Sequence, residues 1–286
     1  MVAGLLATGV IVLWPTTTAT VNRPFATISP TIRDDELTAW EPIFIGVESC
    51  RALTINPRPM RVYAVRIDLQ APGIDFLVTP GNGPGPKDTN ARTTSGFLHE
   101  FKCQVAINGL PYAMPLASTP GEPLTVLGLS LSRGVMYSSP NRYDALLINA
   151  DRYAWISRPP IAVQDAYNGL GGFHVLLAKG VNQGNDDDCH PRSAVGISQD
   201  GRYLLLMAID GRQVGYSESA TTWETAEWLR RLGAYDGLNL DGGGSTTLVI
   251  EGPDGTPILL NRPSGGGERP VANHLGVFAR PLVNRD

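Results

Sequence analysis

Alternating apolar and polar positions mark much of this chain as β-strand. In residues 61–69, every second side chain is Tyr, Val, Ile or Leu, which is the pattern of a strand with one buried face. Further short apolar runs predict strands at residues 42–53, 74–79, 103–108, 124–131, 145–149, 175–178, 194–198, 203–209 and 275–279. We therefore expect a sheet-rich mixed α/β (α+β) fold with few helices.

The strongest helical pattern covers residues 223–232. Thr221 is followed three residues later by Glu224, the spacing of a capping box, and Gly233 marks the end of the helix. One side of this helix is expected to carry Trp223, Ala226 and Leu229. The capping box also gives Glu224 a structural role that competes with a catalytic one.

This helix connects a strand that ends at Asp210 to a strand that ends at Asp241. A strand-helix-strand unit predicts a right-handed crossover between parallel strands. Both strands would then bring their carboxyl ends to one edge of the sheet, where ligands bind in open α/β sheets. We expect this crossover to carry the functional site.

Residues 2–14 are almost entirely apolar and are followed by a Pro/Thr-rich stretch. Such a segment resembles a signal peptide or a membrane anchor, although it is shorter than the roughly 20 residues that span a bilayer. A buried strand or helix is the alternative. We expect residues 1–40 to be an anchor-like segment with a linker and residues 41–286 to be one domain. The protein would then be secreted, periplasmic or membrane-anchored and face the outside.

Charge and cysteine content narrow the function classes. The formal net charge is −4, and the 23 basic residues are scattered rather than gathered in a patch, so nucleic acid is a poor candidate partner. The cysteines Cys50, Cys103 and Cys189 show no C-x-x-C spacing, which argues against a zinc ribbon. In an exported protein, one disulfide with one remaining thiol is possible in any pairing.

The segment LNLDGGGSTTLVI, at residues 238–250, interrupts an apolar run with an acid, three glycines and three hydroxyl side chains. A turn alone needs fewer special residues. Glycine amides can approach an anion closely, and neighbouring hydroxyls add donors. The candidate ligand-binding residues here are Asn239, Gly242, Gly243, Gly244, Ser245 and Thr246, beside the carboxylate of Asp241.

Two further features offer polar chemistry. Arg192 directly precedes a predicted strand and can bind a phosphate or carboxylate with its guanidinium fork. Residues 186–190 read DDDCH, but adjacent side chains on a loop converge poorly on one ion, and the calcium-loop pattern does not match. We predict no metal site, while a divalent cation stays open as a cofactor.

Five segments in order resemble the phosphodiester glycosidase family. They are HPRSAVGIS at 190–198, IDGR at 209–212, the helix with Glu224, GAYDGLNLDGGGSTTLVI at 233–250 and ERPVANHLGVF at 268–278. Upstream, AINGLPY at 106–112 and GLGGFHVLLAKG at 169–180 resemble two more of its motifs, so the resemblance covers roughly residues 60–280. The departures from the family pattern lie at Leu110-Pro111-Tyr112, Phe173-His174 and Lys179. We expect these departures to change which substrate is bound more than which type of reaction is catalysed.

The resemblance implies a hydrolase that cleaves the glycosidic bond of a sugar-1-phosphodiester in a glycan, an exopolysaccharide or cell-wall polymer, or a conjugate. In this interpretation Asp241 and Asp210 supply carboxylates, and Arg192, the glycine amides, Ser245 and Thr246 hold the phosphate. Asn108 would orient a sugar hydroxyl, and the remaining acid candidates are Glu224 and Glu268. The alternatives are a noncatalytic glycan- or phosphate-binding module and a phosphodiesterase that cuts the P–O bond.

Overall fold

The computed structural model describes residues 36–282, apart from residues 86, 117–118 and 187. The predicted anchor at residues 2–14 and most of the predicted linker lie outside these residues. Within the described part, no helix has the length and apolar character needed to cross a membrane.

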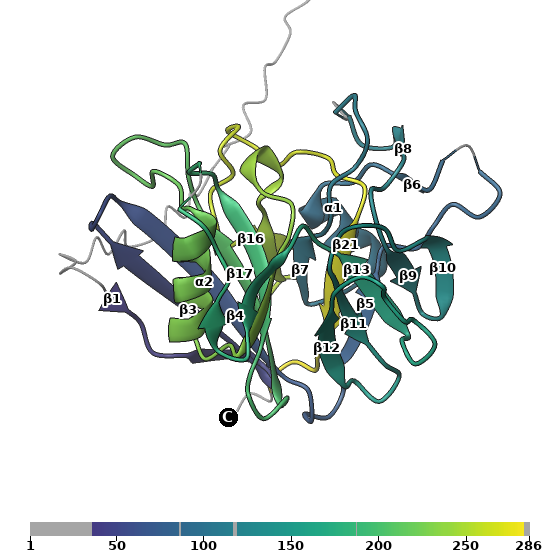
Figure 1. Ribbon diagram of the computed structural model, residues 1–286, viewed down its shortest axis with the longest axis horizontal. Helices are drawn as coiled ribbons and strands as arrows, with labels where there is room; N and C mark the ends of the chain where they lie inside the picture. Colours follow the sequence, from purple (N-terminus) through teal and green to yellow (C-terminus); the bar gives the residue numbers. More distant parts are fainter. Residues whose placement is uncertain (1–35, 86, 117–118, 187, 283–286) are drawn as a thin grey trace, which may run out of the picture. The chain divides into compact units, whose positions relative to one another are not determined.

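Strands dominate the structure, as the alternating pattern predicts, and the mixed, sheet-rich fold class is confirmed (Figure 1). The largest sheet contains β1 (Glu36–Leu37), β2 (Glu41–Phe44), β3 (Val47–Thr54), β4 (Met60–Asp68), β17 (Tyr203–Ile209), β16 (Arg192–Ile197), β18 (Asp236–Asn239), β14 (Val175–Ala178) and β15 (Val181–Asn182). The second contains β20 (Pro257–Leu259), β19 (Leu248–Glu251), β7 (Val105–Asn108), β21 (His274–Phe278) and β5 (Asp75–Val78).

A third sheet is formed by β10 (Val135–Ser138), β9 (Ser130–Ser132), β13 (Asn168–Gly171), β11 (Ala145–Ile148) and β12 (Ala154–Ser157). A short pair is formed by β6 (Thr89–Asn90) and β8 (Pro123–Leu124). The helices are α1 (Thr94–Phe101), α2 (Thr222–Arg231) and a 3₁₀ turn, η1 (Gly243–Ser245). The segment 124–131 is therefore not one strand, since its ends belong to β8 and β9.

Strand β17 shows how the sheets and helices form layers. Leu204, Leu206 and Ala208 face the main core, which is shared with strands of the second and third sheets. The intervening side chains face a separate cluster that contains Ala226 and Leu229 of α2. Because side chains alternate between the faces of a strand, β17 is buried on both sides. Helix α2 therefore covers one face of the largest sheet, and the second sheet lies across the other.

The predicted crossover is present, with one addition. Strands β17 and β18 each pair antiparallel with β16, which lies between them, so β17 and β18 run in the same direction. Their carboxyl ends therefore reach the same edge of the sheet. The start of β16, at Arg192, reaches that edge too, because β16 runs the opposite way.

Helix α2 begins as the capping box predicts. The Thr221 hydroxyl accepts a hydrogen bond from the Glu224 N–H at 3.1 Å, and the Glu224 carboxylate accepts one from the Thr221 N–H at 2.8 Å. The predicted apolar face is wrong at one position. Trp223 is 50% exposed, while Trp228 is buried at 5%.

Two other expectations need correction. Residues 42–53 form a hairpin rather than one strand, because Gly46 adopts a φ of +75° between β2 and β3. A side chain at Gly46 would also place its Cβ 2.1 Å from the Cβ of Ala71. All three cysteines are free thiols, with Cys50 and Cys103 buried and Cys189 exposed, so the possible disulfide does not form.

Candidate active site

A cavity of about 370 Å³ opens at the sheet edge where β17 and β18 end and β16 begins. Its walls come from five separate parts of the chain. They consist of Phe173, His174, His190, Arg192, Arg212, Asn239, Leu240, Asp241, Gly242, Gly243, Gly244 and Arg269. These lining residues include three arginines and one aspartate, so the cavity carries a positive charge that suits an anionic ligand.

The backbone of Asp241 is fixed on both sides. Its N–H donates to the Gly109 carbonyl at 2.9 Å, and its carbonyl accepts from the Asn108 amide at 2.6 Å. The Asn108 side-chain oxygen also accepts hydrogen bonds from the Ser193 hydroxyl at 2.6 Å and the Thr247 N–H at 3.1 Å. Asn108 is fully buried and does not line the cavity. Its hydrogen bonds hold the Asp241 loop in place, and the contact with a sugar hydroxyl that the resemblance implied stays a prediction.

Asp241 is half-buried as a residue and lines the cavity. Burial raises its pKa, because the charged form loses water. The Ser245 hydroxyl, the Arg269 guanidinium and the Gly242 N–H oppose this shift, since each favours the carboxylate. A carboxyl group with a raised pKa is suited to accept a proton during a reaction near neutral pH.

The three glycines are explained by close contacts. A Cβ at Gly242 would lie 2.5 Å from the Pro191 carbonyl oxygen, and one at Gly244 would lie 2.2 Å from a guanidinium nitrogen of Arg269. Gly243 has a φ of +63°, and a Cβ there would lie 3.3 Å from the Arg212 guanidinium. Removing these side chains therefore lets two arginines lie directly against the loop that follows Asp241.

Substituting Gly244→Ala tests this arrangement. The new methyl group overlaps the end of a flexible side chain, so we expect Arg269 to move while the melting temperature changes little. For a phosphodiester substrate, which the resemblance implies, the catalytic efficiency should fall by about tenfold or more, because a charge-assisted contact is lost. Gly265→Ala is the matched control, since the nearest atom to its Cβ is 3.8 Å away. Unchanged efficiency in Gly244→Ala would contradict this role of the glycine.

Several amide N–H groups of the glycine loop already have partners within the protein, and the predicted anion-binding nest stays a prediction. The Gly243 N–H donates to the Pro191 carbonyl at 2.8 Å, and the Ser245 and Thr246 N–H groups donate to carbonyls of Gly242 and Gly243 within the loop. The Gly242 N–H faces the carboxylate of Asp241. The positive charge in the cavity therefore comes from arginine side chains more than from backbone amides.

The arginines differ in how they are held. Arg192 is buried, and its guanidinium donates to the carbonyls of Ala220 at 2.9 Å and Asp188 at 2.7 Å. Arg212 lies in the turn after β17 with a φ of +59°, and its guanidinium contacts the His190 ring at 3.0 Å. Within the described residues, the guanidinium of Arg269 has no hydrogen-bonded carboxylate. Arg212 and Arg269 are thus the better placed of the three to contact a bound anion.

The structure does not bring Asp210 into the cavity, although it lies at the same sheet edge as Asp241. Asp210 is 1% exposed, and its carboxylate accepts hydrogen bonds from the Asn261 amide and the Arg262 N–H, each at 3.0 Å. Burial raises its pKa to about 6, and the contacts with Asn261 and Arg262 limit the rise. Asp210 therefore holds the loop after β20 and is not among the residues that line the cavity.

The raised pKa of Asp210 predicts a pH-dependent stability. Between its ordinary value of 3.8 and about 6, the folded protein holds a proton that the unfolded chain has released, so stability falls as pH rises through this window. The loss is at most about 3 kcal/mol for a shift of this size. Unfolding by urea at pH 4 and pH 7 should show a smaller decrease in Asp210→Asn than in the wild type. Equal decreases in both proteins would contradict the assignment.

The other predicted site residues lie outside the cavity. Ser245 and Thr246 are buried beneath the glycines, with the Ser245 hydroxyl close to Asp241. Glu224 caps α2 and forms an ion pair with Arg58, and Glu268 accepts a hydrogen bond from the Ser95 N–H at 2.8 Å. Of the predicted set, the structure gathers Arg192, Asn239, Asp241, Gly242, Gly243 and Gly244 around the cavity.

Sequence reasoning missed four polar residues of the cavity: His174, His190, Arg212 and Arg269. The two arginines lie within the motifs IDGR and ERPVANHLGVF. Their positive charges could have indicated from the sequence that these motifs contribute to an anion-binding site. The histidines carry no spacing pattern. Among the described residues, no group of three or more His, Cys, Asp or Glu side chains could hold a metal ion.

The residues that line this cavity lie within a part of the chain that is similar to known proteins. The model of the phosphodiester glycosidase family matches residues 101–278. The mouse N-acetylglucosamine-1-phosphodiester alpha-N-acetylglucosaminidase is 41% identical over 61 residues, which is 21% of this chain and 11% of the mouse protein. An uncharacterized SPbeta prophage-derived protein of Bacillus subtilis is 33% identical over 88 residues, or 31% of this chain and 13% of that protein. The matches thus span little of either relative's length.

The fold is also similar to a solved structure, the zebrafish N-acetylglucosamine-1-phosphodiester alpha-N-acetylglucosaminidase catalytic domain auto-inhibited by its pro-peptide. The TM-score is 0.61 at 19% identity, over 87% of this chain and 89% of that one. At this identity the likeness concerns the fold. The family match covers more than half of the chain, from before β7 to the end of β21. The chain therefore belongs to the phosphodiester glycosidase family.

Proposed function

We propose that this protein hydrolyses the glycosidic bond of a sugar-1-phosphodiester, with Asp241 acting at the anomeric carbon. The observation that carries the proposal is a cavity in which one carboxylate lies among three arginines. The arginines suit the phosphate, and the carboxylate suits the carbon that becomes electron-poor as the bond breaks. The family to which the chain belongs supports the same reaction class.

The proposed reaction breaks the bond between the anomeric carbon and the phosphate oxygen. The electron pair of that bond stays on the phosphate, where Arg212 and Arg269 stabilise the added charge. Water supplies the oxygen that bonds to the anomeric carbon, and the proton it loses passes to Asp241 or to a histidine of the cavity. Since phosphate leaves as a stable anion, its departure needs no strong general acid. This fits a cavity whose described lining residues include one carboxylate rather than two.

The rest of the cavity provides surfaces for the sugar. The Phe173 ring lies in the wall and packs edge-on against Tyr143, with 5.6 Å between the ring centroids. Phe173 and His174 stand where the family usually has two other residues. We therefore expect the sugar preference of this protein to differ from that of other family members. As part of the proposal, the apolar segment at residues 2–14 supports export or a membrane tether.

The proposal is tested with a panel of sugar-1-phosphodiesters that begins with N-acetylglucosamine, the sugar named for the mouse and zebrafish proteins. Free sugar and a phosphomonoester are the expected products. Release of a sugar phosphate would instead indicate cleavage of the P–O bond. Binding without turnover across the panel would indicate a noncatalytic module.

A further inference from the structure

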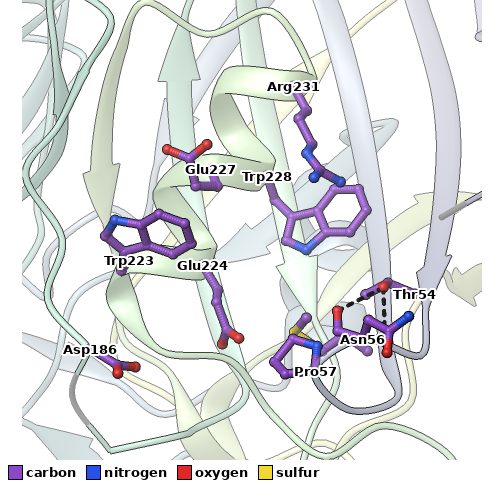
Figure 2. A pocket seen from close by; sticks show the side chains of 10 residues that line it. Thr54, Asn56, Pro57, Asp186, Trp223, Glu224, Glu227, Trp228 and Arg231 are labelled. Carbon is purple, nitrogen blue, oxygen red and sulfur yellow. Dashed lines mark hydrogen bonds between the residues drawn. The ribbon is translucent and has the colours of Figure 1, made fainter. Parts of the chain in front are cut away.

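A second cavity, of about 450 Å³, lies beside α2, between the helix and the turn from β3 to β4, and is separate from the proposed active site. Figure 2 shows that α2 supplies two indole rings and two carboxylates to its wall, while the end of β3 and the loop after it supply Thr54, Asn56 and Pro57. The positions 223, 224, 227, 228 and 231 follow the three- and four-residue spacing of one helix face. The wall is thus one continuous surface.

The indole of Trp223 has no role in the core. It is 50% exposed, although it lies in the first turn of a helix whose other tryptophan, Trp228, is buried at 5%. In Figure 2 the two rings lie on either side of Glu224. Indole rings present wide, flat, apolar faces on which the C–H faces of a sugar ring can stack, while polar groups at the edge bind its hydroxyls.

The charges around this cavity favour a neutral ligand. Glu224 forms an ion pair with Arg58, and the Glu227 carboxylate accepts hydrogen bonds from Arg230 at 2.7 Å and from the Asn182 amide at 2.8 Å. Arg231 lies over the Trp228 ring at 5.0 Å. Paired carboxylates keep acceptor capacity for hydroxyl groups but attract cations weakly. The wall also carries the Asp186 carboxylate, which disfavours an anionic ligand, while the acceptor oxygens of these acids suit the hydroxyl groups of a neutral, hydroxyl-rich one.

A residue that lines each cavity lies close to the same stretch of backbone before α2. Ala220 and His190, which lines the first cavity, exchange backbone hydrogen bonds of 3.1 and 3.0 Å, and Trp223 follows Ala220 by three residues. Three peptide units plus one antiparallel bridge place the Cα atoms of His190 and Trp223 at most about 17 Å apart. An oligosaccharide of a few residues can bridge such a distance.

We propose that this second cavity binds a neutral sugar residue of the carbohydrate chain attached to the substrate. The link to the substrate rests on the proposed function, whereas the binding itself does not. The protein would then favour polymeric or oligosaccharide substrates over small conjugates, because binding at the second cavity adds to binding at the first.

The test measures binding apart from turnover. Asp241→Asn protein, which retains the second cavity, is titrated with cellotetraose, maltotetraose, chitotetraose and mannotetraose and followed by calorimetry and tryptophan fluorescence. At least one should bind and change the fluorescence. Adding Trp223→Ala should weaken that binding about tenfold or more, a loss of about 1.4 kcal/mol. Trp223→Phe, which keeps an aromatic face, should recover part of it.

Tyr153→Ala is the matched control, because Tyr153 is 60% exposed and lies just before β12 in the third sheet, and it should bind as the parent does. Binding of none of the four sugars, or equal binding with and without Trp223, would overturn the proposal. Neither result depends on hydrolysis, so a failure here is distinct from a failure of the proposed function. Conversely, sugar binding by a protein that hydrolyses no phosphodiester would support the second cavity alone.

Discussion

Replacing Asp241 with asparagine is expected to lower kcat for a sugar-1-phosphodiester by between about 10² and 10⁴, because the cavity loses the carboxylate that either accepts a proton from water or attacks the anomeric carbon. Asparagine has nearly the same shape and keeps the backbone hydrogen bonds to Gly109 and Asn108. Since burial already raises the pKa of Asp241, removing the charge should not lower the melting temperature. Steady-state kinetics with matched melting curves measures both effects.

The control for Asp241→Asn is Asp165→Asn, which alters an exposed carboxylate that does not line the cavity. It should hydrolyse the substrate as the wild type does. Hydrolysis by Asp241→Asn at the wild-type rate would contradict the catalytic assignment. The anomer released by the wild type separates two roles for Asp241, because direct attack followed by hydrolysis retains configuration, whereas activation of water inverts it.

The second large effect is expected for Arg269→Ala. Its guanidinium lies against Gly244 and, within the described residues, has no hydrogen-bonded carboxylate. Removing it should lower kcat/KM for a phosphodiester by about 10² to 10³, the cost of losing one charge-stabilising donor. A nitrophenyl glycoside of the same sugar has no phosphate, so its hydrolysis should fall less. The comparison of the two substrates, measured in one variant, isolates the contact with phosphate.

Arg142→Ala serves as the control for Arg269→Ala, since Arg142 is exposed and lies outside the cavity. Arg269→Lys keeps the charge but not the planar fork, so an intermediate loss is expected. Equal losses on the phosphodiester and the nitrophenyl glycoside would show that Arg269 acts on the sugar or on the fold. That outcome would contradict its assignment to phosphate.

Local patterns predicted much of the fold because they depend on neighbours in sequence. The alternation in residues 61–69 identified β4, and Thr221 with Glu224 identified the start of α2. The crossover placed Asp210 and Asp241 at one sheet edge. The insertion of β16 between β17 and β18 could not be predicted, because strand order depends on contacts that are distant in sequence.

For the candidate site too, features set by neighbouring residues could be predicted, and features set by contacts distant in sequence could not. Asp241, Arg192 and the glycines stood out locally, and the structure places them in one cavity. The part played by Asp210 was not visible, because its partners Asn261 and Arg262 lie 51 and 52 residues further along the chain. Arg269 was missed for a related reason. Its place against the glycine loop follows from the path of the segment before β21, which no pattern in the sequence specifies.

Hydrolysis in water enriched in oxygen-18, followed by ³¹P NMR of the product, tests the central claim most directly. Cleavage between the anomeric carbon and oxygen leaves the original oxygen on phosphate, so the phosphomonoester should carry no label. The phosphate oxygens do not exchange with water under these conditions, which makes the product a lasting record of the bond that broke. An unlabelled phosphomonoester is the predicted result, and oxygen-18 on phosphorus would contradict it.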